Sequence, residues 1–143
     1  TLRLGSAMSL DLSTIANNRL QNIEVIDMAN DGGNSTLVLN NDDILNLPGS
    51  DGANTLRIEG SVGDTVDLLG SSFTDSGTTT TINTNTYDIY TSTDTDSTVQ
   101  LQIQQGVTVE VPLLIELSDI EVGTGGFAIY GVSNTRILDY FFQ

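Results

Sequence analysis

The sequence predicts an all-β protein whose short strands stack as coils, as in a β-solenoid or β-roll. Three observations lead to this prediction. Short apolar-x-apolar triplets recur along residues 1–70, turn-forming Asn, Asp, Gly and Ser separate them, and one segment repeats after about 20 residues. An antiparallel β-sandwich with tight hairpins is the alternative, because it spaces its strands in a similar way.

The triplets have the periodicity of a strand. The outer two residues of each are apolar, and the middle one is usually charged or polar, which places the outer pair on one face of a strand. The triplets are Leu2-Arg3-Leu4, Leu10-Asp11-Leu12, Ile23-Glu24-Val25, Leu37-Val38-Leu39, Leu45-Asn46-Leu47, Leu56-Arg57-Ile58 and Val66-Asp67-Leu68.

The internal repeat aligns residues 31–37 with residues 51–56, and residues 43–47 with residues 64–68. A repeat that carries two short strands is typical of one solenoid coil, which buries its apolar pairs by stacking on the next coil. Residues 41–47 also admit a single helical turn capped by Asn40 or Asn41 and ended by Pro48, and residues 14–20 admit another.

The composition of the sequence changes after Gly70. Thr79–Ile82 and Thr86–Tyr90 predict a Thr-rich hairpin, followed by two alternating strands at Val99–Ile103 and Val107–Val111. We expect residues 1–143 to form one β-rich domain: repeat coils at 1–70, the hairpin and alternating strands at 71–111, and closing strands or a linker toward a neighbouring domain at 112–143. The apolar tail at 137–142 must be buried in this chain or in a partner.

Composition excludes several functions. The chain has 19 acidic residues, 4 basic residues and a net charge of −15, with no Lys, His, Cys or Trp. A Ser-His-Asp triad, a Cys nucleophile and a His-ligated zinc are therefore excluded. We expect no catalysis. We expect no nucleic-acid partner, because the negative charge of the chain repels phosphates. We also expect no membrane insertion, because no apolar run approaches about 20 residues.

The acidic turns predict bound Ca²⁺. Hard cations prefer clustered carboxylate, amide and carbonyl oxygens, and the turns of this sequence are rich in Asp and Asn. In stacked coils, Asp31 would lie above Asp51 and Asp43 above Asp64, and such like charges repel unless a cation lies between them. The alternative is that these side chains only cap their own turns. The candidate ligands are Asp27, Asp31, Asp42, Asp43, Asp51, Asp64, Asp94 and Asp96.

The order of the motifs resembles a module of giant secreted bacterial adhesins of the repeats-in-toxin type. The resemblance covers about residues 9–111 and is carried by Asn18–Met28, Asn34–Leu39, Asp43–Leu47, Asn54–Gly60, Gly63–Leu68 and Thr86–Tyr90. The calcium-binding nonapeptide repeat of that family is missing here. Residues 31–34 match only part of it. The resemblance implies a biofilm and cell-surface protein with an all-β fold.

These observations together predict a structural or adhesive module, stabilised by Ca²⁺, of a large secreted, extracellular bacterial surface protein. Its partners would be other domains of the same chain or neighbouring subunits. One alternative is a calcium-dependent carbohydrate-binding module with glycan partners. Another is a filament or fibre subunit that donates its apolar tail as a strand. Thr1 is not an initiator Met, so we interpret the chain as a fragment or a processed product.

Overall fold

The computed structural model describes residues 1–29, 32–47, 54–69, 73–92 and 99–111. All of them lie within one compact unit, Thr1–Leu113. Strands dominate these residues, which confirms the all-β prediction. The elements are β1 (Leu2–Arg3), β2 (Ser9–Asp11), the 3₁₀ turn η1 (Leu12–Thr14), β3 (Val25–Asp27), β4 (Thr36–Leu39), α1 (Asn41–Asn46), β5 (Thr55–Glu59), β6 (Thr65–Leu68), β7 (Phe73–Ile82), β8 (Asn85–Ser92), β9 (Val99–Gln104) and β10 (Thr108–Glu110).

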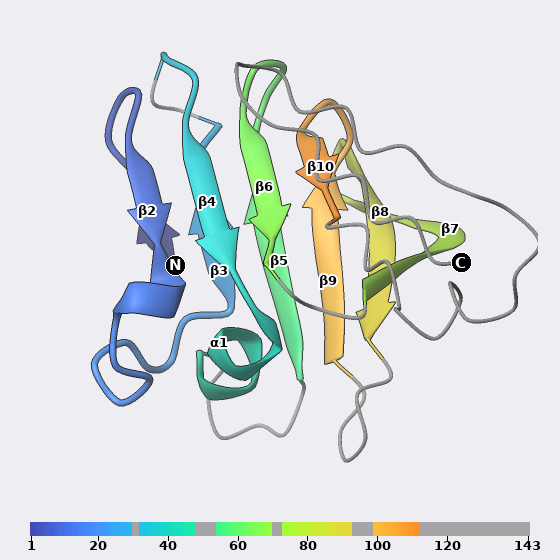
Figure 1. Ribbon diagram of the computed structural model, residues 1–143. Coiled ribbons are helices and arrows are strands. Elements are labelled where there is room, and N and C mark those ends of the chain that lie inside the picture. The colour runs from blue at the N-terminus through green and yellow to red at the C-terminus, as the bar shows by residue number, and fades with distance from the viewer. Residues whose placement is uncertain (30–31, 48–53, 70–72, 93–98, 112–143) are drawn as a thin grey trace, which may run out of the picture. The chain divides into compact units, whose positions relative to one another are not determined.

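The strands form two sheets that the chain visits alternately (Figure 1). Sheet A has the order β1-β3-β5-β9-β8-β7, and sheet B has the order β10-β6-β4-β2. Every pair among β1, β3, β5 and β9 is parallel, and so is every pair in sheet B. The pairs β1/β2, β3/β4, β5/β6 and β9/β10 are therefore four stacked coils, here called coils 1 to 4. Stacked coils, rather than an antiparallel sandwich, are the observed arrangement.

The coil repeat differs from the repeat seen in the sequence. Arg3 is level with Asp27, 24 residues later, and the Ser35–Asp64 hydrogen bond links residues 29 apart at the start of β4 and β6. Leu37 and Leu56, which the sequence repeat aligns, lie in different sheets. The repeat of about 20 residues therefore relates successive strands of different sheets, because the strands of both sheets carry the same apolar alternation. The structural coil is longer than this repeat.

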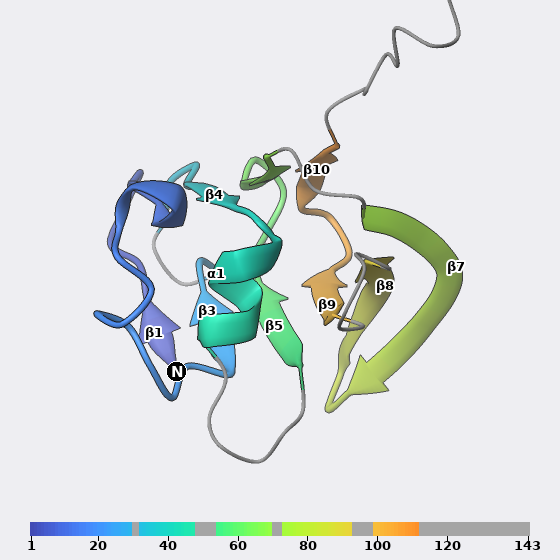
Figure 2. The same cartoon turned by 60° about the horizontal axis from the view of Figure 1, so that its bottom comes forward.

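An antiparallel hairpin is inserted between coils 3 and 4. β7 and β8 pair across the turn at Asn83, which has a positive φ of 57°, as the Thr-rich sequence predicted. β8 then pairs antiparallel with β9 and extends sheet A. β7 bends strongly (Figure 2), with a register shift between Asp75 and Thr79 and a positive φ at Gly77. The two strands predicted after the hairpin, β9 and β10, form coil 4.

The core lies between the two sheets, where the outer residues of the triplets meet. Ile26, Leu56, Ile58 and Leu101 point inward from sheet A and pack with Leu37, Leu39, Val66 and Leu68 from sheet B. All of these side chains are fully buried. Because burial of a Leu or Ile side chain contributes roughly 1.5–3 kcal/mol, this shared row of aliphatic pairs is the main source of stability that the sequence supplies.

One predicted strand triplet is helical. Residues 41–46 form α1, and Asn40 caps it: the Asn40 side chain accepts the N–H of Asp43, and the Asp43 side chain accepts the N–H of Asn40. This reciprocal capping box satisfies two backbone groups of the first turn. The helical interpretation of this segment is therefore correct, and α1 packs Ile44 into the core. At the other candidate turn, the structure has η1 at Leu12–Thr14 and a turn from Ala16 to Arg19.

Candidate functional site

Asp64, one of the candidate calcium ligands, joins two coils. It is fully buried at the turn before β6. One carboxylate oxygen accepts the backbone N–H of Ser35 at 2.9 Å, and the other accepts the backbone N–H and the hydroxyl of Ser61 at 2.7 and 3.1 Å. Three donors compensate the buried charge. Asp64 therefore holds the start of β4 against the start of β6.

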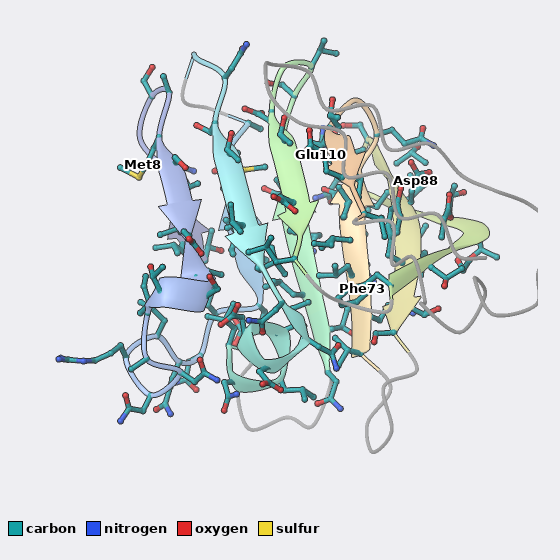
Figure 3. The ribbon with its side chains drawn as sticks, viewed as in Figure 1. Met8, Phe73, Asp88 and Glu110 are labelled. Carbon is teal, nitrogen blue, oxygen red and sulfur yellow. The ribbon has the colours of Figure 1, made fainter. Side chains whose placement is uncertain are left out.

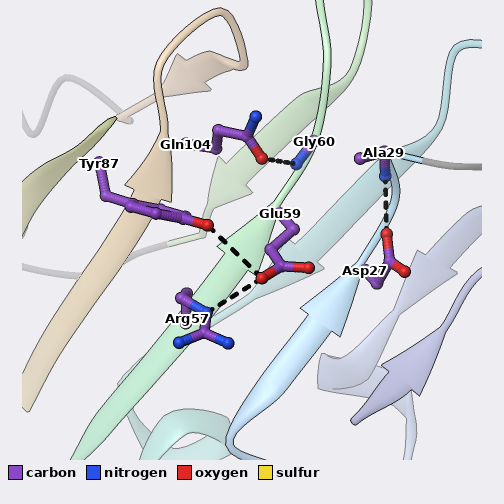
Figure 4. Close-up of polar contacts among 7 residues, drawn as sticks. All are labelled: Asp27, Ala29, Arg57, Glu59, Gly60, Tyr87 and Gln104. Carbon is purple, nitrogen blue, oxygen red and sulfur yellow. Dashed lines mark hydrogen bonds and ion pairs between the residues drawn. The ribbon is translucent and has the colours of Figure 1, made fainter. Parts of the chain in front are cut away.

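Asp27 performs the same task between coils 1 and 2. It is 2% exposed, and it accepts the Nε–H of Arg3 at 2.8 Å and the backbone N–H of Ala29 at 3.0 Å. Figure 4 shows the contact with Ala29 at the end of β3. The ion pair links two registered neighbours on adjacent strands, where opposite charges stabilise a sheet.

The predicted ladder of Asp43 over Asp64 is wrong. Asp43 is the third residue of α1, whereas Asp64 precedes β6, where its hydrogen bond places it level with Ser35. The error follows from aligning helix residues with a strand. Burial raises the pKa of Asp43, the hydrogen bond from Asn40 opposes this, and the carboxylates of Asp42 and Asp11 raise it further. Asp42 is exposed in the first turn of α1.

The remaining candidate ligands, Asp31, Asp51, Asp94 and Asp96, lie outside the described residues. So do the predicted Asp31–Asp51 ladder, the segment 112–143 and the apolar tail. Within the described ranges, no three acidic side chains come together where a metal ion would bind. The Ca²⁺ prediction therefore stays a prediction, and among its described candidate ligands Asp27, Asp43 and Asp64 accept backbone hydrogen bonds.

The outer face of sheet A carries a polar cluster that the sequence analysis did not single out. Arg57 on β5 lies 3.2 Å from Glu59 (Nε to Oε1) and 6.0 Å from the ring centroid of Tyr87. The Tyr87 hydroxyl donates to Glu59 at 3.4 Å, and the side-chain carbonyl of Gln104 accepts the Gly60 N–H at 3.2 Å (Figure 4). The sequence held one indication of this cluster: Arg57 is the middle residue of its triplet, and such residues point outward.

Tyr87 and Tyr90 lie on opposite faces of β8, as their spacing in a strand predicts. Tyr87 is level with Gln104 on the outer face, whereas Tyr90 is level with Leu101 and packs against the core. Burial, followed by the carboxylates of Asp75 and Asp88, raises the pKa of Tyr90. Its hydroxyl therefore stays protonated across the neutral pH range.

The outer face of sheet B shows two rows in register across all four coils. One row is made of hydroxyls, from Ser9, Thr36, Thr65 and Thr108. The other row contains Asp11, Val38, Asp67 and Glu110, and Figure 3 labels Glu110 on β10. Asp67 and Glu110 are direct neighbours on adjacent strands, where like charges are destabilising. This face is thus acidic and hydroxyl-rich.

Comparisons with known proteins gave no match: no family model, curated protein or solved structure corresponds to the chain. None of the helices in the described part is both long and apolar enough to cross a membrane. The chemistry that the described residues support is hydrogen bonding and charge neutralisation at strand ends and on two sheet faces.

Proposed function

We propose that this chain is a non-catalytic structural and adhesive module of a large secreted bacterial surface protein, and that Ca²⁺ stabilises it. The observation that carries the proposal is the stack of four coils, which ends in β1 and β2 at the outer edges of the two sheets. Edge strands with unpaired backbone groups are templates for further pairing. A stack of this kind can be continued by neighbouring coils, which suits a protein built from consecutive modules.

The acidic side chains support a role in assembly of the fold rather than in catalysis. Asp27 and Asp64 are buried, and each accepts a hydrogen bond from a neighbouring coil, Asp27 from the Arg3 side chain and Asp64 from the backbone N–H of Ser35. A general acid or a nucleophile needs an oxygen that is free to meet a substrate, whereas these oxygens are engaged by the protein. The buried carboxylates are therefore best explained as parts of the scaffold.

Electrostatic repulsion supports the calcium part of the proposal. The chain carries 19 acidic and 4 basic residues, and Asp67 and Glu110 are neighbours on the outer face of sheet B. A divalent cation held by turn or surface carboxylates would lower this repulsion more effectively than Na⁺, because Ca²⁺ takes six to eight oxygen ligands. Metal binding to the folded state alone would raise the melting temperature.

The calcium proposal is tested by differential scanning calorimetry of metal-free protein at constant ionic strength. We expect 2 mM CaCl₂ to raise the melting temperature by several degrees over EGTA, with 2 mM MgCl₂ as the matched control. Equal melting temperatures in EGTA and CaCl₂ would refute calcium stabilisation. An equal rise with MgCl₂ would also count against it, because that result indicates general screening rather than an oxygen-rich calcium site.

A calcium-dependent glycan-binding module is the second candidate, and the hydroxyl row on sheet B favours it. Ser9, Thr36, Thr65 and Thr108 present a continuous polar surface beside carboxylates, the groups that such a site needs. Beads coated with the chain and passed over immobilised polysaccharides test it. Retention that requires Ca²⁺ and is lost in a Thr36→Val/Thr65→Val variant supports this function. Equal retention with EGTA, or by the variant, contradicts it.

A further inference from the structure

The outer face of sheet A carries no net charge, although the chain as a whole is strongly acidic. On β1, β3, β5, β8 and β9, the outward charged residues form two ion pairs, Arg3 with Asp27 and Arg57 with Glu59. The strand residues on the outer face of sheet B, by contrast, include three acidic side chains and no basic one. Sheet A is therefore the face that suits a neutral ligand, because the net charge repels anions and sheet B attracts cations.

A stripe of amide side chains runs along β9 in the middle of this face. The amide stripe consists of Gln100, Gln102 and Gln104, which alternate with buried core residues and are themselves half-buried. Successive members lie roughly 6.6 Å apart, because a strand rises about 3.3 Å per residue. Arg57 on the neighbouring strand β5 is level with Gln102. A guanidinium group therefore lies beside the stripe.

Arg57 is held by its neighbours and still has free donors. Its Nε lies 3.2 Å from Glu59 Oε1, and its guanidinium carbon lies 6.0 Å from the ring centroid of Tyr87 (Figure 4). Tyr87 is 1% exposed, and its hydroxyl donates to the same Glu59 oxygen. No described residue accepts a hydrogen bond from Nη1 or Nη2 of Arg57, and 28% of this side chain is exposed. These N–H groups are thus oriented in advance and accessible to a ligand.

The glutamines are restrained in a similar way. The side-chain oxygen of Gln104 accepts the Gly60 N–H at 3.2 Å, which leaves its Nε2 group as a donor. Gln102 Nε2 donates to Gln100 Oε1 over a long 3.5 Å contact, which a ligand can replace. The face therefore presents several N–H donors and the side-chain oxygen of Gln102 as an acceptor. Because their contacts limit their motion, these groups lose less conformational entropy on binding.

We propose that the outer face of sheet A binds a neutral polysaccharide. Sugar hydroxyls accept hydrogen bonds from Arg57 and the amide stripe, and they donate to the side-chain oxygen of Gln102. The site needs no metal ion and lies on a different sheet from the calcium-dependent glycan candidate. It rests on the adhesive role proposed above and names its ligand, whereas calcium stabilisation holds or fails independently of it.

The spread of the donors favours a polymer over a small molecule. The amide stripe and Arg57 occupy two adjacent strands of a sheet face and are not gathered around one point. Small-molecule sites are concave and bury most of the ligand surface. Contacts repeated along a chain gain affinity from their number instead, so a polysaccharide matches this face better than a single sugar.

The test is affinity electrophoresis through native gels that contain dextran, xyloglucan, glucomannan or mixed-linkage β-glucan, with EGTA in every buffer. A neutral polysaccharide retards a protein specifically when it binds, and a gel without polysaccharide supplies the reference mobility. We expect at least one of the four polymers to retard the chain, with a retardation that saturates as the polymer concentration rises. Alginate is the anionic comparison.

Matched variants locate the binding face. Gln102→Ala removes the centre of the amide stripe and should raise the dissociation constant at least fivefold. Gln105→Ala is the control, because Gln105 is exposed in the turn after β9 and bonds to Asp88 instead, and it should change the constant less than twofold. Arg57→Lys keeps the charge but removes the planar pair of Nη donors, and it should also weaken binding. Thermal denaturation confirms that each variant is folded.

Four results would overturn the proposal. The first is equal mobility in all gels, and the second is an equal loss in Gln102→Ala and Gln105→Ala. The third is retardation that requires Ca²⁺ and disappears in Thr36→Val/Thr65→Val, which would place the site on sheet B. The fourth is tighter binding of alginate than of any neutral polymer, which would make Arg57 the centre of an anion site. None of these results bears on the calorimetric test of calcium stabilisation.

Discussion

At the scale of single residues, the acidic side chains divide by what they contact. Asp64 binds three donors from two coils, and Asp27 binds Arg3 and a backbone amide. Asp67, in contrast, is half-buried on the outer face beside Glu110. Asp27 and Asp64 therefore act as connectors between coils, whereas outward carboxylates supply repulsion and solubility.

Removal of the Asp64 side chain tests the connector role. Asp64→Ala leaves the N–H groups of Ser35 and Ser61 buried or part-buried without an acceptor, so we expect the free energy of unfolding to fall by about 3 kcal/mol. Urea denaturation measures it. Asp67→Ala, three residues along and facing outward, is the control and should change stability by less than about 0.5 kcal/mol. Equal losses in both variants would contradict the assignment.

At the scale of elements, each coil is positioned by contacts between turns as well as by its strands. Gly60 follows β5, and a Cβ atom placed there would overlap the Cγ2 atom of Val107, just before β10. It would also approach Asp64 and Met28 within 3.4 Å. Coils 3 and 4 thus meet at a position where only a glycine fits.

This close approach predicts a suppressible defect. Gly60→Ala should lower the free energy of unfolding by about 1–3 kcal/mol, because overpacking displaces Val107 and its neighbours. Val107→Ala removes the overlapping methyl group, so the double variant should lose less free energy of unfolding than the two single variants lose in sum. A thermodynamic cycle from thermal denaturation measures this coupling. Strictly additive losses would show that the Gly60–Val107 contact is not the cause.

At the scale of the whole molecule, charge imbalance opposes the compact state. The net charge of −15 comes from 19 acidic and 4 basic residues. Two of the arginines, Arg3 and Arg57, are already paired with Asp27 and Glu59 on sheet A. On sheet B, the registered row of Asp11, Val38, Asp67 and Glu110 contains no basic residue. No basic residue of this row therefore offsets the repulsion between Asp67 and Glu110.

Salt should accordingly stabilise the chain. We expect the melting temperature, measured in EGTA, to rise by several degrees between 50 and 500 mM NaCl, because screening shortens the range of repulsion to about 4 Å. An Asp67→Asn/Glu110→Gln variant should melt higher at low salt and gain less from added NaCl. A melting temperature that falls with NaCl would show that attractive ion pairs dominate instead.

The all-β class, the Thr-rich hairpin and the outward direction of the polar triplet residues were predictable from the sequence, because local alternation and turn chemistry are encoded by neighbouring residues. The internal repeat favoured stacked coils, with an antiparallel sandwich left as the alternative. The capping of α1 by Asn40 was also predictable, although a strand was an equal possibility because Leu45 and Leu47 fit both periods.

The identity of neighbouring strands, in contrast, could not be read from the sequence. Sequence similarity aligned Leu37 with Leu56, but backbone pairing places them in different sheets and sets Leu37 beside Val66. For the same reason Asp43, in α1, does not stack on Asp64, which is level with Ser35. Register is fixed by long-range pairing and by side-chain volume between the sheets, and no local pattern carries that information.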